Sequence, residues 1–298
     1  MTELSPSRLG KYTKCPRMYD YYYVQDLTVP DFTRRYMDRG QALHKTIEHV
    51  CDRIDVSYTE GDIRNLSIEL FEESWEEQTD RNEYDTKAHY RYDRQLAKAG
   101  IEHYFGDGPG LEHVRNSIGT EVEVSCENEG VRLHGRADNI VETNDGLRIV
   151  DYKPKLDDII TDKKNYLEEH DSGEGYHPKR VKSIFQAATY LEGVKNLPEY
   201  DEEMELEFTF YGLLNNRDFE KSADGVKATA TGRGRDVAWI YEKYYDKVWE
   251  MISEAYEGII NESFEPEPWD LIRENVCGDC DYRKMCPDYI SEEVRFDV

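Results

Sequence analysis

Two aspartates and a lysine fall on neighbouring strand-like segments, where together they could hold a divalent cation. The segments are separated by Asn-Asp-Gly at 144–146, and an Asp-Gly pair is a strong signal for a β-hairpin. If residues 145–146 form the loop, Asp138 faces Lys153 and lies diagonally across from Asp151, so all three side chains share one face of the sheet. Two inward carboxylates repel each other, and a hard cation offsets that cost. The pattern alone leaves two interpretations open, a metal site and a solvated acidic face.

Four cysteines at opposite ends of the chain have the spacing of metal ligands. Cys277, Cys280 and Cys286 form the pattern C-x2-C-x5-C, and Cys15 resembles Cys286 because a proline follows each of them. Zinc and an iron-sulfur cluster both accept four thiolates, so ligand chemistry alone does not choose between them. The other two cysteines fall on helix and strand patterns and are expected to be core thiols: Cys51 and Cys126.

The elements that position these residues follow from the periodicity of apolar side chains. A short helix is expected to begin after Ser5, its predicted N-cap. The polar stretches 156–182 and 215–235 are predicted to be mobile excursions. Helical steps cover 40–54, 63–77, 87–105, 183–194 and 237–260, and strand alternation covers 121–126, 131–143, 147–153 and 205–214. This order predicts one α/β domain with a central mixed sheet flanked by helices.

The motifs, taken in order, resemble the PD-(D/E)XK nuclease superfamily. Gly-Arg-Ala-Asp at 135–138 and Ile-Val-Asp-Tyr-Lys at 149–153 are similar to its D…(D/E)-x-K core. Gly-Gln-Ala-Leu-His at 40–44 resembles the helix-borne histidine of the RecB-like branch, and the segment 186–190 resembles its Q-x-x-x-Y motif. The resemblance implies a restriction-endonuclease-like core, with the extra helices of 63–105 as a helical insertion, and metal-dependent cleavage of phosphodiester bonds.

The resemblance also implies a role for each residue. Mg²⁺ or Mn²⁺ would be held by His44, Asp138, Asp151 and the backbone carbonyl of Tyr152. Lys153 would orient the attacking water or stabilise charge on the phosphate. Gln186 and Tyr190 fall on one helix face and would support Lys153 or the DNA backbone. Glu121 could extend the acidic cluster from the neighbouring strand, but an exposed strand position is the interpretation that we favour.

One early cysteine and a late C-x2-C-x5-C resemble the iron-sulfur branch of RecB-like nucleases, which includes the CRISPR-associated "Cas-four" exonucleases and the AddB nuclease domain. The resemblance implies a 4Fe-4S cluster on Cys15, Cys277, Cys280 and Cys286, with zinc as the alternative. Such a centre would join the two ends of the chain. The predicted organisation within residues 1–298 is a cluster-ligand segment (1–30), a helical region (40–110), a catalytic core (118–214) and a C-terminal helix with the cysteines (237–298).

The charge of the chain argues against bulk attraction to nucleic acid. The 38 Lys and Arg residues against 64 Asp and Glu give a formal net charge of -26. At molar salt the Debye length is about 3 Å, so a high-salt cytosol would tolerate such a surface. DNA contacts would then be local, and the candidate residues are Arg8, Arg17, Lys179, Arg180 and Arg233. The sequence shows neither an export signal nor a membrane span, which predicts a cytoplasmic protein, from a halophile or encoded by a virus.

These features predict a metal-dependent DNA nuclease, an exonuclease on single-stranded ends. Its expected setting is recombination or repair, viral DNA processing or CRISPR adaptation, with recombination, helicase or CRISPR adaptation proteins as partners. The sequence contains no G-x-x-x-x-G-K-[ST] phosphate loop, so nothing in it indicates a helicase. The alternative is a catalytically silent iron-sulfur DNA-binding subunit or scaffold.

Overall fold

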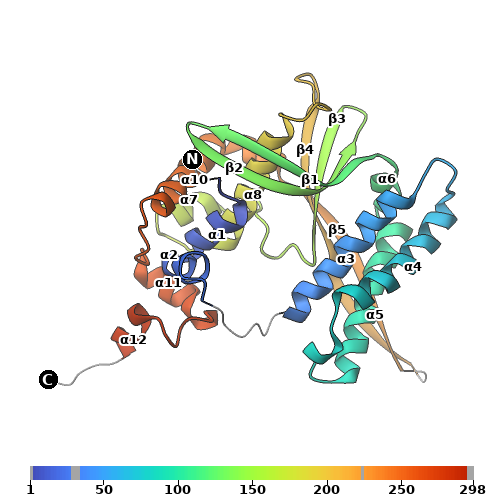
Figure 1. The fold of residues 1–298 in the computed structure, drawn as a ribbon, viewed down its shortest axis with the longest axis horizontal. Helices are drawn as coiled ribbons and strands as arrows, with labels where there is room; N and C mark the ends of the chain where they lie inside the picture. The colour runs from blue at the N-terminus through green and yellow to red at the C-terminus, as the bar shows by residue number, and fades with distance from the viewer. Residues whose placement is uncertain (1–2, 28–33, 223–224, 294–298) are drawn as a thin grey trace.

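A five-stranded sheet lies between two groups of helices (Figure 1). The computed structural model describes residues 3–27, 34–222 and 225–293. The strands are β1 (Ser117–Asn128), β2 (Val131–Glu142), β3 (Gly146–Lys153), β4 (Glu205–Ser222) and β5 (Gly225–Asp236). The helices are α1 (Pro6–Lys14), α2 (Pro16–Tyr19), α3 (Arg34–Arg53), α4 (Glu60–Gln78), α5 (Lys87–Gly106), α6 (Gly110–Arg115), α7 (Tyr166–Asp171), α8 (Pro178–Val194), α9 (Ala238–Lys243), α10 (Tyr245–Ile260), α11 (Trp269–Asn275) and α12 (Pro287–Glu293). Three shorter helical segments are η1 (Asp20–Val24), η2 (Arg81–Glu83) and η3 (Cys277–Asp279).

The sheet is mixed, and its strands lie in sequence order from β1 to β5. Strands β3 and β4 are parallel, whereas every other neighbouring pair is antiparallel. Parallel strands require a long crossover, and the segment that contains α7 and α8 supplies it. The prediction of an α/β fold with a mixed central sheet and flanking helices is therefore confirmed. Among the described helices, none combines the length and the apolar character that crossing a membrane requires.

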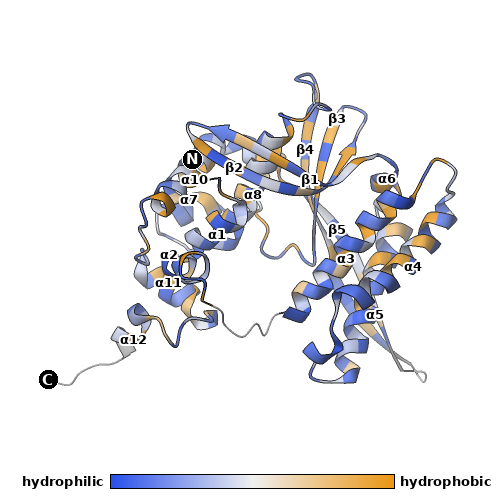
Figure 2. Cartoon of the chain, viewed as in Figure 1, coloured by the Kyte–Doolittle hydropathy of each residue, from blue (hydrophilic) through white to orange (hydrophobic). Residues whose placement is uncertain are grey.

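The alternation of side chains along β3 divides the core into two layers. Leu147 and Ile149 face a cluster built with α8, α9 and α10, whereas Val150 and Tyr152 face a cluster built with α3, α4 and α5. Figure 2 shows hydrophobic residues interspersed with hydrophilic ones along the strands and helices. Each side chain on β3 therefore points toward one helical layer or the other.

The β2–β3 hairpin has a different register from the predicted one. Ile140 pairs with Ile149, and the amide of Thr143 donates to the carbonyl of Gly146 at 2.8 Å, so the two-residue loop is 144–145. The prediction was wrong because Gly146 begins the strand: a Cβ there would lie 2.0 Å from the carbonyl oxygen of Glu205 on β4. The shift is by an even number of positions, so each side chain keeps its predicted face.

Three other expectations require correction. The stretch 215–235 is not an excursion, because β4 and β5 continue through it as a long hairpin whose small side chains let α5 pack against the sheet. The stretch 156–182 belongs partly to the core, since Leu156 and Ile160 are buried in it. The last long helix is two helices, α9 and α10, that meet at Tyr244.

The two ends of the described chain meet in a third apolar cluster. Arg17 on α2 donates to the carboxylate of Asp288 on α12 at 3.0 Å. The hydroxyl of Tyr282 donates to the carbonyl of Leu27 at 3.0 Å. These contacts hold the N-terminal helices against the cysteine segment. Residues 28–30 of the predicted cluster-ligand segment lie outside the described residues.

Candidate active site and cysteine centre

The hairpin places Asp138, Asp151 and Lys153 on one face of the sheet. The β2–β3 pairing ends with Asn139 opposite Val150, and the next positions in the same register are Asp138 and Asp151. The two aspartates are therefore directly opposite each other, closer than the diagonal neighbours that the sequence predicted. Asp151 is buried and its Oδ1 lies 2.5 Å from the ammonium nitrogen of Lys153. The Lys153 side chain as a whole remains partly exposed. A carboxylate pair and a cation therefore converge at the end of the β2–β3 ladder.

His44 reaches this point from α3, on the other layer of the structure. Its Nε2 lies 2.7 Å from the backbone carbonyl of Tyr152, and its Nδ1 lies 3.4 Å from Oδ2 of Asp138. A carbonyl can only accept, so the N–H at Nε2 donates to it, and Nδ1 faces the carboxylate. The same carboxylate oxygen accepts from the amide of Tyr152 at 2.7 Å. The sequence predicted that the Tyr152 carbonyl binds the metal. Here it accepts the hydrogen bond that orients the ring of His44.

Helix α8 covers the site with the two residues of the predicted Q-x-x-x-Y motif. The side-chain amide of Gln186 donates to Asp151, and it also donates to the hydroxyl of Tyr190 at 3.2 Å. Tyr190 packs over Gly135 of β2, where a Cβ would lie 2.3 Å from its ring. Gln186 therefore supports the carboxylate of Asp151 directly, and Tyr190 supports it through Gln186. Neither side chain makes a hydrogen bond to Lys153 within the described residues.

Glu121 on β1 joins the site, although we favoured an exposed position for it. The β1–β2 register sets it between the pairs Thr120–Asn139 and Val122–Ala137, opposite Asp138. One ligand atom from each of His44, Glu121 and Asp138 lies within 4.8 Å of the other two. The backbone of Glu121 has φ 52°, a left-handed conformation that costs a residue with a side chain about 1–3 kcal/mol.

The electrostatics of the site follow from burial next to charges of both signs. Burial raises the pKa of Asp138 to about 6, while His44 and Lys153 oppose the rise and Asp151 adds to it. Burial alone would lower the pKa of Lys153, but the charges of Asp151 and Asp138 reverse the sign and raise it. Lys153 is therefore cationic, and the two carboxylates need further positive charge.

These residues open into a groove that encloses about 1080 Å³ between the sheet, α1 and α3. His44, Glu121, Asp138, Lys153 and Gln186 all contribute to its walls. Sites for small molecules usually enclose about 300–1000 Å³, so this groove is large enough for a segment of a polymer.

Comparison with known proteins assigns the family. A family model described as the PD-(D/E)XK nuclease superfamily matches residues 3–287. The chain belongs to the PD-(D/E)XK nuclease superfamily. No curated protein matches the chain. Among solved structures, one described as a "Putative exonuclease" from Eubacterium rectale is similar, with 13% sequence identity, coverage of 95% of this chain and 87% of that chain, and a TM-score of 0.45.

The donor set of this nuclease domain fits the divalent metal that the superfamily implies. Hard cations prefer carboxylate oxygens, and Glu121 and Asp138 supply them within 4.8 Å of one another and of a ring nitrogen of His44. Among the described residues Asp151 lies outside this set, since its two oxygens face Lys153 and Gln186. Burial is the main cause of the raised pKa of Asp138, and a bound cation would offset that cost to the carboxylate. The metal roles of His44, Asp138, Asp151 and Tyr152 stay predictions, as do the catalytic roles of Lys153, Gln186 and Tyr190.

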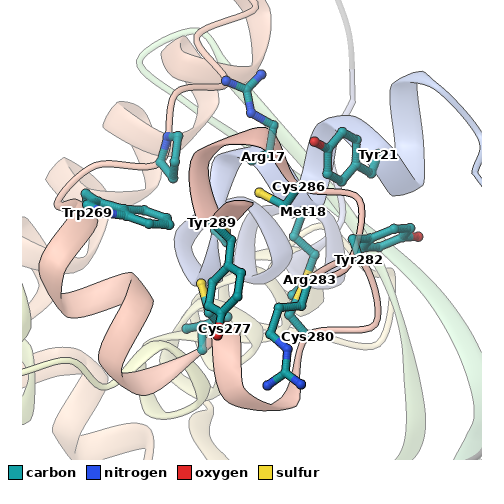
Figure 3. Close-up of a pocket in the computed structure, with 13 residues that line it drawn as sticks. Arg17, Met18, Tyr21, Trp269, Cys277, Cys280, Tyr282, Arg283, Cys286 and Tyr289 are labelled. Atoms are coloured by element: carbon teal, nitrogen blue, oxygen red, sulfur yellow. The ribbon is translucent and has the colours of Figure 1, made fainter. Parts of the chain in front are cut away.

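The four predicted cluster cysteines line one cavity, although 261 residues separate Cys15 from Cys277. Cys15 caps the start of α2, Cys277 begins η3, and Cys280 and Cys286 follow it. Figure 3 shows Trp269, Tyr282 and Tyr289 around the sulfur atoms. Aromatic side chains thus shield the thiols from water.

Burial disfavours the thiolate form of these cysteines. It is the main cause that raises the pKa of Cys15 to about 12 and that of Cys277 to about 11, and the neighbouring thiols add to both rises. Burial also raises the pKa of Cys280. Thiolates are the form that binds metal, so a bound cation would offset this cost. Cys126 is buried and Cys51 packs against the second core layer, as expected for core thiols.

Proposed function

We propose that the protein is a metal-dependent deoxyribonuclease, an exonuclease acting on single-stranded ends. The observation that carries the proposal is the convergence of Asp138, Asp151 and Lys153 with His44 in an open groove of a PD-(D/E)XK nuclease domain. A groove of this size suits a polymer. Two exposed side chains on its rim, Tyr36 and Met37, offer surfaces on which unstacked bases can pack.

The chemistry follows from the positions of these groups. Mg²⁺ or Mn²⁺, when bound by the acidic side chains and His44, would lower the pKa of a water ligand and neutralise charge on the phosphate. Lys153 keeps its proton beside Asp151, so it would position the attacking water or stabilise the charge that develops on the phosphate. Gln186 fixes the orientation of Asp151 through its amide donor. Each residue therefore acts through charge and position.

Cleavage of labelled single-stranded DNA tests this proposal. With Mn²⁺ we expect the wild type to shorten a 5′-labelled oligonucleotide, and Lys153→Ala to lose at least 100-fold in rate, as the loss of one charged transition-state contact usually does. The matched control is Lys155→Ala, which removes a lysine that pairs with Asp157 at 3.7 Å beside the groove. Equal digestion by wild type and Lys153→Ala would show that the site is wrong. Absence of digestion by the wild type under several salts and metals would favour the silent DNA-binding scaffold.

We further propose that Cys15, Cys277, Cys280 and Cys286 hold a 4Fe-4S cluster. A zinc ion with four sulfur ligands at about 2.3 Å would hold the sulfur atoms about 3.8 Å apart. Among the described residues, no three of these thiols lie within 4.8 Å of one another, although they line a single cavity. The wider spacing favours the larger cluster over zinc.

The composition of the purified protein tests the cluster. Protein purified without oxygen should be brown, with about four iron atoms and four acid-labile sulfides per chain. Colourless protein with one zinc ion per chain would refute the proposed cluster and leave the nuclease proposal intact. Action in recombination, viral DNA processing or CRISPR adaptation, and the corresponding protein partners, stay predictions, as does a high-salt cytoplasmic setting.

A further inference from the structure

The cations that line the groove are already neutralised by acidic partners. Lys45 lies 2.8 Å from Glu48, Arg136 lies 2.8 Å from Glu121, and Lys153 lies 2.5 Å from Asp151. A polyanion entering the groove of this acidic protein therefore meets little free positive charge at the groove walls.

The cations predicted to contact DNA are mostly engaged as well. Arg17 bonds Asp288 at 3.0 Å, and Lys179 bonds Asp158 at 2.9 Å. Arg180 donates to the carbonyl of Asp157 at 3.0 Å. Arg233 lies in a different hollow, next to His113 on the opposite layer of the sheet. Of the predicted five, only Arg8 remains as a candidate near the groove.

Arg8 belongs to a set of four cations without acidic partners, which we call the basic row. Its members are Arg8, Lys11 and Lys14 on α1 and Lys182 on α8, and none of them makes an ion pair in the part of the chain that the structure describes. The stem of Lys182 lies across Gly10, where a Cβ would be 2.5 Å from its Cγ. The row is therefore continuous across the contact between α1 and α8.

The basic row connects the two sites of the molecule. Lys182 lies one turn before Gln186 on α8, and Gln186 bonds Asp151. Helix α1 begins with Ser5 and Pro6 at the groove and ends at Lys14, directly before Cys15 (Figure 1). A strand that follows the row would thus run from the cysteine centre to the metal site.

The row carries an electrostatic cost that acidic groups offset only in part, since Asp151 raises the pKa of Lys182 and Asp281 raises that of Lys11 by less than other causes lower them. Burial and the charges of Lys153 and Lys14 lower the pKa of Lys182. Burial and the charges of Lys14 and Lys182 likewise lower the pKa of Lys11. These cations repel one another in a chain with a net charge of -26, where acidic partners are abundant. A ligand with regularly spaced negative charges would remove the repulsion.

Aromatic rings accompany the row on its outer side. The ammonium nitrogen of Lys11 lies 3.4 Å from the ring centroid of Tyr22, and the guanidinium carbon of Arg8 lies 4.7 Å from that of Tyr23. Tyr22 is 48% exposed. Cations that follow a backbone beside exposed rings are typical of surfaces that bind single strands, because bases stack on the rings while phosphates meet the charges.

We propose that the basic row and Tyr22 form the path along which a single strand of DNA reaches the active site. The inference rests on the proposed nuclease function and adds the route of the substrate. Duplex DNA fits less well, because its paired bases are not free to stack on Tyr22.

Binding measured without cleavage tests the path. We would follow the anisotropy of a labelled oligothymidylate with EDTA present, over a series of salt concentrations. The variant Lys11→Gln, Lys14→Gln, Lys182→Gln removes three charges from the row. The control Lys98→Gln, Lys195→Gln, Lys247→Gln removes three lysines that each pair with a carboxylate, so both variants have the same net charge.

We expect the row variant to bind at least tenfold more weakly than the control. Each phosphate contact to a single strand contributes about 0.7 to the slope of log K against log salt, so the slope should fall by about 2. An unchanged slope, an equal loss in the control, or equal affinity of the wild type for duplex DNA would overturn the proposal. If wild type and row variant digest DNA equally and bind it equally, only the path is wrong. If the row governs binding but no DNA is digested, the path stands and the nuclease proposal fails.

Crosslinking to the wild type avoids any dependence on the folding of a variant. An oligonucleotide containing 5-iodouridine, irradiated in the complex, should attach to the peptide that contains Tyr22. Attachment confined to peptides outside residues 5–24 and the groove would contradict the path.

Discussion

Replacing Glu121 by glutamine tests whether the unexpected third acidic residue binds the metal. The change keeps the size of the side chain and one acceptor oxygen, and it removes the charge. At a separation of about 5 Å, a negative charge stabilises a divalent cation by about 1.7 kcal/mol even at the dielectric constant of bulk water. We therefore expect Glu121→Gln to weaken Mn²⁺ binding by more than tenfold. Arg136 lies 2.8 Å from the same carboxylate and cancels part of its attraction for the metal, whereas a dielectric constant below that of water would strengthen the attraction.

The assay is the titration of free Mn²⁺ by electron paramagnetic resonance, in the absence of DNA. Glu123 provides the matched control, because it lies two residues along β1 and lines the same groove but belongs to no set of ligand atoms around His44. Glu123→Gln should bind Mn²⁺ within about twofold of the wild type. Wild-type affinity in Glu121→Gln, or an equal loss in both variants, would refute the assignment of Glu121 to the metal site.

Three further outcomes follow from packing and charge. Gly135→Ala should destabilise the fold by about 1–3 kcal/mol in urea unfolding, because its Cβ would lie 2.3 Å from the ring of Tyr190, and an unchanged midpoint would contradict this packing. Cys15→Ser should lose most of the bound iron whereas Cys126→Ser keeps it, as measured by iron content after anaerobic purification. Burial, as the main cause, lowers the pKa of His113 to about 4 from 6.5, so the unfolded chain binds this proton first as the pH falls. Stability should decrease by about 3 kcal/mol between pH 6.5 and pH 4 from this group alone, and His113→Gln should flatten that part of the pH profile of the unfolding free energy.

Spacing in the sequence predicted the common face of the candidate site residues, because side-chain direction in a strand depends only on parity. The predicted register was wrong by two positions, yet Asp138, Asp151 and Lys153 kept their common face. The register itself depended on a contact that no local pattern reveals, the approach of Gly146 to Glu205 on a strand that follows much later in the chain. Local signals therefore predicted the faces of the sheet, and tertiary contacts decided the pairing.

The position of Glu121 beside Asp138 could have been predicted from the short loop between β1 and β2. The loop between β1 and β2 is Glu129 and Gly130, both with positive φ, and a two-residue loop at that point sets position 121 opposite Asp138. A two-residue loop sets Glu121 beside Asp138 in this hairpin just as the next one sets Asp151 there. The long β4–β5 hairpin gave no comparable signal, because its small side chains resemble a loop until α5 is seen to pack on them.

The acidity of the chain, which seemed to argue against DNA, gives the proposed path its selectivity. On a surface with a net charge of -26, a phosphate backbone is repelled almost everywhere, so a few unpaired cations define the approach more sharply than they would on a basic protein. The groove itself attracts a phosphate weakly, since its cations are held by carboxylates and the carboxylates of the candidate metal site would repel a phosphate until a cation binds. The basic row would then capture the strand, and the metal would determine where it is cut. Removal of the metal should therefore abolish cleavage and leave DNA binding intact. If the metal instead bridged the protein and the DNA, removing it would abolish binding as well.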